Sequence, residues 1–214
     1  LWANPSVAAV GIDNYMPASD WRGVASQTGE GRSGHDPQML RQLLVGGEGF
    51  DWYYASLEDR RLGVRTAITD GLNKPWVFRF KDLKSWWSNQ HFDRPNGQEL
   101  PQPTAWQPER KPFIFTELGC PAVNNGASQP NVFVDAKSSE TAVPYFSNGG
   151  RNDLIQARFL EAHQGLWSAD HPQFDGQSNP LSTVYGDRMV DFLHSQYWAW
   201  DARPYPQFPE LEEI

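Results

Sequence analysis

The sequence predicts an α/β fold built around a parallel sheet. Short apolar runs alternate with helical patterns along the chain, which is typical of strands joined by helices. The apolar runs are continuous, as in strands that are covered on both faces. Three of them end in polar residues, and long loops lie beside these ends, as at the carboxyl edge of a parallel sheet. With 214 residues, we expect one domain over residues 1–214.

The first third of the chain predicts one strand and two helices. Residues 7–13 form an apolar run, and residues 19–35 are rich in Gly, Ser and polar side chains, which predicts a loop. Asp36 precedes Pro37, so we expect an N-cap followed by proline at the first helical position. Ser56, followed by acidic residues, predicts a second helix that ends near residue 65.

The middle of the chain contains the clearest strand. Residues 74–80 read as a strand, and residues 82–87 as a short helix. Residues 88–109 are polar and Pro-rich, so we expect a long loop. Residues 111–117 form an apolar run opened by a proline and followed by Gly and Pro, which predicts a strand with a sharp end.

The last third predicts a long loop, a helix and a final strand. Residues 120–149 show little periodicity and read as loop, whereas residues 182–189 are weakly helical and residues 196–200 read as a strand. Residues 151–167 predict an amphipathic helix. Its expected inward side chains are Leu154, Ile155, Phe159, Leu160 and Ala162.

Composition excludes several classes of partner. The formal net charge is −8 and no basic run is longer than two residues, so we expect no nucleic-acid partner. No stretch approaches the roughly 20 apolar residues that cross a bilayer, so we expect no membrane insertion. A single cysteine, Cys120, excludes an internal disulfide. The spacing of the Cys and His residues does not suggest a metal site or a cofactor.

Carboxylates and aromatic side chains follow three of the predicted strands. Asp13 and Tyr15 follow the first, Glu117 ends the strand at 111–117, and Asp201 follows the last. Glycoside hydrolysis needs two carboxyl groups across the scissile bond, and Glu117 suits the nucleophile or the base. The alternatives stay open: Glu117 could cap a turn or pair with an arginine, and Asp13 could hold a loop or pair with Arg22.

Aromatic residues make up 14% of the chain, with ten Trp, seven Tyr and twelve Phe. Large aromatic side chains are ordinary core material. Several tryptophans, however, lie in polar, Gly- or Pro-rich sequence that is typical of loops. An indole ring packs well on the apolar face of a sugar ring, so tryptophans around a cleft would suit glycan binding. These tryptophans are Trp21, Trp52, Trp86, Trp87, Trp106, Trp198 and Trp200.

Six runs, in order along nearly the whole chain, resemble the TIM-barrel-like domain of gene transfer agent and phage tail proteins. That domain is similar to retaining glycoside hydrolases with paired glutamates on barrel strands four and seven. The runs are VGIDNYMPASDWR (10–22), EGFDWYYAS (48–56), KPWVFRFKDLKSWW (74–87), FTELGCPAVNNG (115–126), QPNVFVDAKSSE (129–140) and YWAWDARPYPQFP (197–209).

The resemblance implies a fold and a role for each strand end. The chain would be the C-terminal part, about strands six to eight, of a (β/α)8 TIM barrel of glycoside hydrolase type. Glu117 would be the nucleophile on strand seven. Tyr15 on strand six would keep the Glu117 carboxylate ionised and correctly oriented, and Asp13 would lie at the same end of the barrel. The general acid on strand four would precede this chain, which begins without Met and reads as a piece of a longer polypeptide.

The last strand would complete the substrate site. In the YWAWD run, Trp200 is the best match to the tryptophan that forms the floor of the sugar-binding site, and Trp198 is the second-best match. The implied substrate-binding residues are Asp13, Tyr15, Trp198, Trp200 and Asp201.

The resemblance also implies a function and a location. The full-length parent would hydrolyse cell-wall or surface polysaccharide by a retaining two-carboxylate mechanism, from the tail of a phage-like particle assembled in the bacterial cytoplasm. Its partners would be polysaccharide or peptidoglycan and the other tail proteins. The alternative is a non-catalytic glycan-binding or structural tail-tip module on a glycosidase fold, because a fold does not fix a function.

Overall fold

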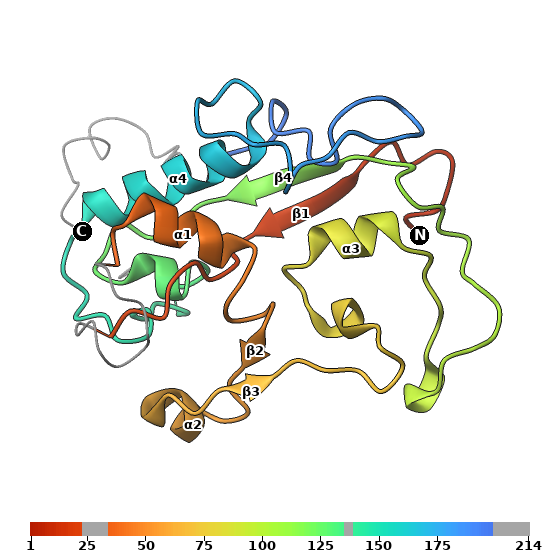
Figure 1. Cartoon of the computed structure of the whole chain (residues 1–214). Helices are drawn as coiled ribbons and strands as arrows, with labels where there is room; N and C mark the ends of the chain where they lie inside the picture. The colour runs from red at the N-terminus through yellow and green to blue at the C-terminus, as the bar shows by residue number, and fades with distance from the viewer. Residues whose placement is uncertain (23–33, 135–138, 199–214) are drawn as a thin grey trace. The chain divides into compact units, whose positions relative to one another are not determined.

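The computed structural model describes residues 1–22, 34–134 and 139–198 (Figure 1). The chain divides into two compact units, each made of three segments. Unit 1 consists of Leu1–Ile12, Val45–Phe115 and Gln164–Ser195. Unit 2 consists of the described parts of Asp13–Leu44, Thr116–His163 and Gln196–Ile214. Within the described residues, no helix is long and apolar enough to cross a membrane.

Strands β1 (Val10–Asn14) and β4 (Phe113–Leu118) form a two-stranded sheet. The Val10 N–H donates to the Pro112 carbonyl at 2.9 Å, and Tyr15 bonds to Glu117. Both pairs are 102 residues apart, and such a constant separation means that the strands run in the same direction. Figure 1 shows both arrows pointing the same way. The predicted strands at 7–13 and 111–117 are therefore confirmed, with shifted ends.

Strand β1 is not buried on both faces, contrary to the expectation from its apolar run. Val10 and Asn14 are buried, whereas Gly11 and Asp13 are exposed and Ile12 is intermediate. This alternation is that of a strand with one covered face. The expectation of burial on both faces was wrong because the small residues of this run, Ala and Gly, carry little information about burial.

Three predicted helices are confirmed. They are α1 (Pro37–Leu44), α3 (Leu83–Ser88) and α4 (Asp153–Trp167). Helix α1 starts where the Asp36 carboxylate accepts bonds from the next backbone N–H groups, at 2.9 and 3.1 Å. Helix α4 buries Ile155, Phe159 and Ala162, but Leu154 is 51% exposed because it lies one position off that stripe.

Unit 1 contains a small hairpin that the sequence did not predict. Strand β2 (Trp52–Tyr53) pairs antiparallel with β3 (Thr66–Ala67), and α2 (Leu57–Leu62) lies in the connection. Two-residue strands are too short to show a period. Ser56 caps the start of helix α2, as predicted. The helix ends at residue 62, because Gly63 adopts φ 74° and its backbone N–H donates to carbonyls of the last turn.

The predicted strand at 74–80 is wrong. Residues Pro75–Phe78 form a 3-10 helix, η1, with proline at its start. Its apolar side chains do not enter a sheet: Val77 is 40% exposed and Phe78 is 55% exposed. A continuous apolar run predicts a strand only where neighbouring strands cover it, and no described strand pairs with this segment.

Two other predicted elements are not formed within the described residues. Residues 182–189 form a turn, because the Ser182 hydroxyl accepts bonds from the N–H groups of Val184 and Tyr185 and Gly186 adopts φ 78°. The final strand at 196–200 is not formed over residues 196–198, and its other two residues lie outside the described residues.

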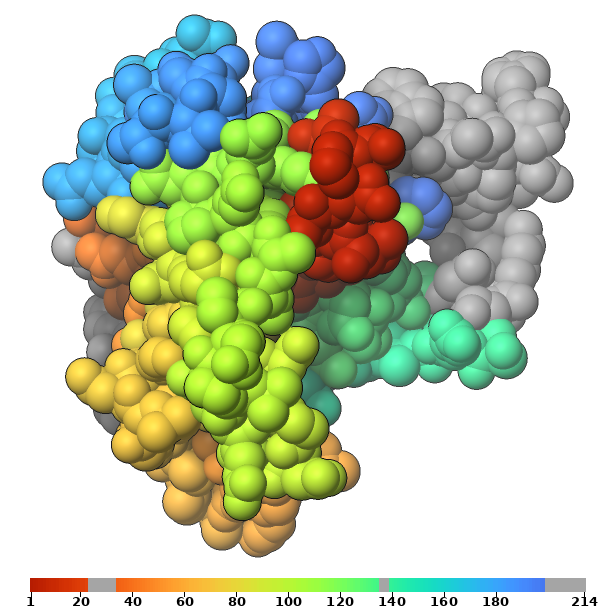
Figure 2. All heavy atoms as spheres, turned by 90° about the vertical axis from the view of Figure 1, so that its right-hand side faces the viewer, coloured from red at the N-terminus to blue at the C-terminus, as the bar shows by residue number. Residues whose placement is uncertain are grey.

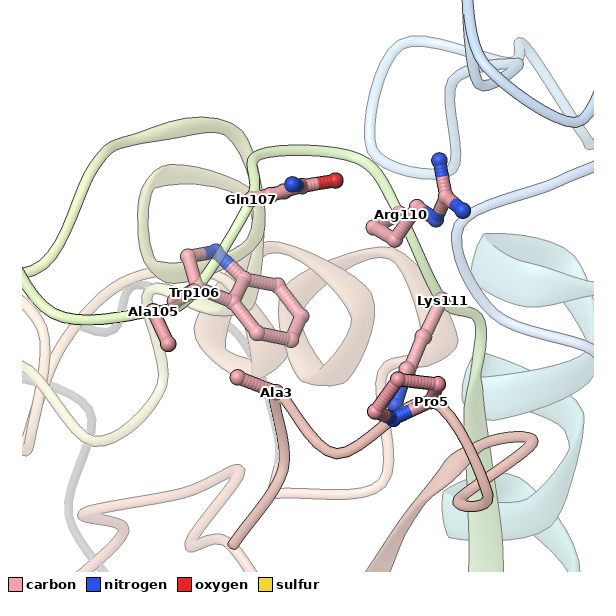
Figure 3. Close-up of a pocket in the computed structure, with 7 residues that line it drawn as sticks. All are labelled: Ala3, Pro5, Ala105, Trp106, Gln107, Arg110 and Lys111. Carbon is pink, nitrogen blue, oxygen red and sulfur yellow. The ribbon is translucent and has the colours of Figure 1, made fainter.

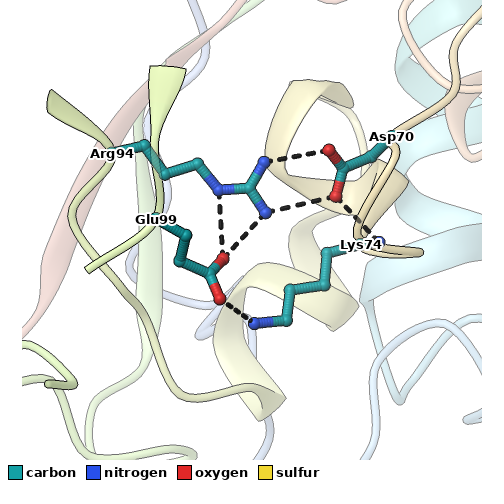
Figure 4. Close-up of polar contacts among 4 residues, drawn as sticks. All are labelled: Asp70, Lys74, Arg94 and Glu99. Carbon is teal, nitrogen blue, oxygen red and sulfur yellow. Dashed lines mark hydrogen bonds and ion pairs between the residues drawn. The ribbon is translucent and has the colours of Figure 1, made fainter. Parts of the chain in front are cut away.

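The predicted long loop at 88–109 is confirmed and is fixed by charged side chains. The Arg94 guanidinium donates to Asp70 at 3.0 and 3.2 Å and to Glu99 at 2.9 and 3.1 Å (Figure 4). Lys74 completes the network, with its ammonium 2.5 Å from Glu99. The loop contains one 3-10 turn, η2 (Pro95–Gly97). A similar turn, η3 (Gly126–Ser128), lies in the loop that follows β4.

Candidate functional site

The carboxyl ends of β1 and β4 bring together the polar residues that the sequence singled out. Asp13 lies near the end of β1 and Tyr15 follows it, while Thr116 and Glu117 lie near the end of β4. All four residues belong to unit 2. Because the two strands are parallel neighbours, their carboxyl ends meet at one edge of the sheet.

Tyr15 and Glu117 form the central contact of this edge. The Tyr15 hydroxyl donates a hydrogen bond to Glu117 Oε2 at 2.5 Å, and both side chains are partly buried. The Tyr15 ring packs edge-on against Phe133, with ring centroids 6.0 Å apart and planes at 87°. The phenol is therefore held at both ends, and it fixes one carboxylate oxygen of Glu117.

The surroundings keep Tyr15 in its protonated form. Burial raises the pKa of the Tyr15 phenol well above its ordinary range, and the hydrogen bond to Glu117 and the charges of Glu117 and Asp13 raise it further. Tyr15 is thus a hydrogen-bond donor across the physiological pH range. A bond donated to a carboxylate stabilises the ionised group and fixes its direction.

Asp13 is held by its neighbour on β4. The Asp13 Oδ1 atom accepts a hydrogen bond from the Thr116 hydroxyl at 2.7 Å, and both residues are exposed. Arg22, which the sequence offered as a partner for Asp13, pairs with Asp20 at 3.4 Å. Its guanidinium also lies 4.4 Å from the centroid of the Phe146 ring. The Asp13 carboxylate is therefore held against β4 at the carboxyl end of the sheet.

Trp198 reaches the same edge through its backbone. Its N–H donates to the Leu118 carbonyl at 2.8 Å, and its side chain is 49% exposed. The Trp198 carbonyl passes so close to Gly119 that a Cβ atom there would lie 1.7 Å from its oxygen. Only glycine allows this approach. The other two predicted binding residues of this run, Trp200 and Asp201, lie outside the described residues.

Three residues of this edge were missed by sequence reasoning: Thr116, Gly119 and Phe133. Thr116 lies directly before Glu117 in β4, and a polar residue at the end of an apolar run was a usable signal; Gly119 follows the end of the strand and is buried. Phe133 lies in the long loop after β4, where nothing in the sequence marks it. In unit 1, Trp87 and Trp106 are buried to 1% and 4% exposure, so neither indole presents an open face at the surface on which a sugar ring could stack.

Cys120 does not offer a reactive thiol. Its side chain is fully buried, and burial raises the pKa of the thiol well above its ordinary value. Its carbonyl accepts a bond from the Gln156 side chain of α4 at 2.8 Å. Across residues 1–22, 34–134 and 139–198, no group of three or more His, Cys, Asp or Glu side chains could hold a metal ion.

The family model of the GTA TIM-barrel-like domain, where GTA stands for gene transfer agent, matches residues 1–209, which is nearly the whole chain. No curated protein matches the chain.

Proposed function

Because the chain belongs to the GTA TIM-barrel-like domain family, we propose that it is the glycoside hydrolase-like domain of a gene transfer agent or phage tail protein. The proposed activity is hydrolysis of cell-wall or surface polysaccharide by a retaining mechanism, with Glu117 as the nucleophile. The chain would supply about strands six to eight of the barrel, with β1 as strand six and β4 as strand seven.

The single observation that supports this proposal best is the bond from Tyr15 to Glu117. The phenol occupies Oε2 at 2.5 Å and leaves the second carboxylate oxygen for attack on the anomeric carbon. In the retaining mechanism this attack forms a covalent glycosyl-enzyme, which water then hydrolyses. A fixed carboxylate loses little freedom on reaching the transition state, so positioning by Tyr15 would increase the rate.

The mechanism needs a second carboxyl group about 5–5.5 Å from the first to protonate the leaving oxygen. We assign that general acid to strand four of the barrel, in the parent protein. Asp13 would then have a binding role: its carboxylate, held by Thr116, would accept hydrogen bonds from sugar hydroxyls. Trp198 and, beyond the described residues, Trp200 would contribute the sugar-stacking surface, and Asp201 would accept hydrogen bonds from sugar hydroxyls.

The proposal is tested by glycan release from purified peptidoglycan and from envelope polysaccharide by the full-length parent. Glu117→Gln keeps the size of the side chain and removes the nucleophile, so we expect release to be abolished. Tyr15→Phe should lower kcat by about 10–100-fold, with a smaller change in KM. Glu58→Gln is the matched control, because Glu58 is 60% exposed on α2. Glycan release by Glu117→Gln equal to that by the native parent would rule out Glu117 as the nucleophile.

A non-catalytic glycan-binding module is the second candidate. One observation favours it: Glu117 and Asp13 each accept a hydrogen bond from a neighbouring side chain, as fixed acceptors for sugar hydroxyls would. Glycan that still binds the parent, with no release from the parent or the Glu117 variant, would select this candidate. Antibody labelling of purified particles tests the proposed tail location for both candidates.

A further inference from the structure

Unit 1 contains a small surface cavity for which the proposed hydrolysis has no use. Its volume is about 180 Å³, and it lies between the first residues of the chain and the segment that enters β4. Figure 2 shows the N-terminal segment, in red, against this yellow-green segment. The lining residues, labelled in Figure 3, are Ala3, Pro5, Ala105, Trp106, Gln107, Arg110 and Lys111.

We propose that this cavity binds the carboxylate-bearing ring of an acidic sugar. The cavity combines an apolar wall with two cationic side chains and an amide. A uronic acid has the complementary groups: a ring with an apolar face, one carboxylate, and hydroxyls that can bond to the amide. Its volume is below the usual range for drug-sized ligands, so it suits a single ring. The inference does not depend on the role of Glu117.

The apolar wall is rigid. Trp106 is 4% exposed and stacks on His91, with centroids 5.2 Å apart and planes at 6°. Trp86 packs on the same indole at 4.8 Å. Within the described chain the Trp106 Nε1–H has no hydrogen-bond partner, and Figure 3 shows this nitrogen on the side of the ring near Gln107. Buried donors without partners are rare, and a ligand oxygen at this edge would satisfy it.

The cationic side of the cavity lies opposite Trp106 in Figure 3. The Lys111 side chain is buried, and its ammonium donates to the carbonyls of Trp2 and Asn4 at 2.7 and 2.5 Å. These bonds use two of its three donors. Arg110 is exposed at the rim. Among residues 1–22, 34–134 and 139–198, no carboxylate pairs with Arg110 or Lys111.

The nearest carboxylate in sequence is held away from both cations. Glu109 adopts the left-handed conformation, with φ 58°. Its Oε2 accepts bonds from the Thr183 N–H and hydroxyl at 2.8 and 2.7 Å, and its own N–H donates to the Trp87 carbonyl. The turn that presents Arg110 and Lys111 is thereby fixed, and the Glu109 carboxylate is used by Thr183 and not by either cation, in a chain whose formal net charge is −8.

A guanidinium and an ammonium select a carboxylate, and the indole edge with the Ala and Pro side chains selects a ring with an apolar face. The test follows the indole N–H resonance of Trp106 in the 214-residue chain by NMR, with the resonance assigned from Trp106→Phe. The titrants are methyl glucuronide, the neutral methyl glucoside and inorganic phosphate. We expect a saturable shift with the glucuronide and at least about tenfold weaker binding of the glucoside.

Variants separate recognition from folding. Arg110→Gln, at an exposed position, should weaken glucuronide binding about tenfold or more, and Arg110→Lys should weaken it less. Arg61→Gln removes the same charge from an exposed, Glu58-paired position of unit 1 and should change nothing. Equal affinity for the glucoside, unchanged binding by Arg110→Gln, or phosphate binding as tight as that of the glucuronide would each overturn the proposal.

Discussion

At the scale of single residues, the pairing of Tyr15 with Glu117 is the feature with the most chemical content. The two side chains come from positions 102 residues apart and meet at 2.5 Å because they lie at the carboxyl ends of neighbouring parallel strands. Phe133 fixes the phenol ring, and the pKa of that phenol is raised mainly by burial and then by Glu117. A protonated, fixed phenol is a pre-organised donor to a carboxylate.

The raised pKa of Tyr15 predicts a loss of stability in alkali. In the unfolded chain a tyrosine titrates near its ordinary value of about 10. The stabilisation from the protonated phenol is therefore complete below about pH 10 and is lost as the pH rises from there toward the folded-state pKa. Urea unfolding at pH 8 and pH 11 should show a smaller alkaline loss for Tyr15→Phe than for the native chain.

Glu117→Gln is the informative control for this titration. It removes a charge that raises the pKa of Tyr15 but leaves the burial that raises it most. The loss of stability between pH 8 and pH 11 should then lie between that of the native chain and that of Tyr15→Phe. An alkaline loss in Tyr15→Phe equal to that of the native chain would show that Tyr15 is not the titrating group.

At the scale of elements, the end of β4 depends on close backbone packing. Leu118 accepts the Trp198 N–H, and Gly119 lies under the Trp198 carbonyl, where a Cβ would be 1.7 Å from the oxygen. The segment with Trp198 can lie along β4 only if residue 119 has no side chain. This contact places a half-exposed tryptophan, which is distant in sequence, beside the end of the strand that carries Glu117.

Gly119→Ala should therefore displace the Trp198 segment and destabilise the protein by about 1–3 kcal/mol. Urea unfolding gives the free-energy change, and tryptophan fluorescence reports the new environment of Trp198. Gly71→Ala is the matched control, because a Cβ at Gly71 meets nothing within 4 Å. Its effect should stay within about 0.5 kcal/mol. Equal effects of the two substitutions would contradict the packing argument.

At the scale of the whole molecule, the long loop of unit 1 depends on a charged network. Figure 4 shows Arg94 between Asp70 and Glu99, with Lys74 on the far oxygen of Glu99. A hydrogen bond from Arg94 lowers the pKa of the Asp70 carboxyl, and one from Lys74 chiefly lowers the pKa of Glu99. Charges thus fix a segment that has little regular secondary structure.

Arg94→Gln should reduce the acid sensitivity of the fold. Carboxyls with a lowered folded-state pKa stabilise the protein above their ordinary values near 4, and this stabilisation is lost as the pH falls through the folded values. Thermal unfolding should give a lower melting temperature for Arg94→Gln at pH 7 and a smaller difference from the native chain at pH 3. Added salt at pH 7 should also reduce the difference. A difference that is constant with pH and salt would exclude the charged network as its cause.

The sequence by itself determined the helices and strands whose signals are local. Asp36 before Pro37, Ser56 before its acidic turn and the apolar run before Glu117 are short-range patterns, and each produced the predicted element. Local hydrogen bonds and side-chain periods set these starts and ends, so neighbouring residues suffice to predict them. The family could also be recognised from motifs in the sequence, and the match over residues 1–209 confirms it.

Only the tertiary structure decided features that depend on residues far apart in the chain. The apolar run at 74–80 became a 3-10 helix because no described strand pairs with it, and the β2–β3 hairpin was too short to show a period. The contacts of Phe133 with Tyr15 and of Trp198 with Gly119 depend on packing between distant segments, which no local sequence pattern predicts. Burial and pairing depend on which surfaces meet, and hydrophobic contact is non-directional, so sequence periodicity alone does not specify the partner.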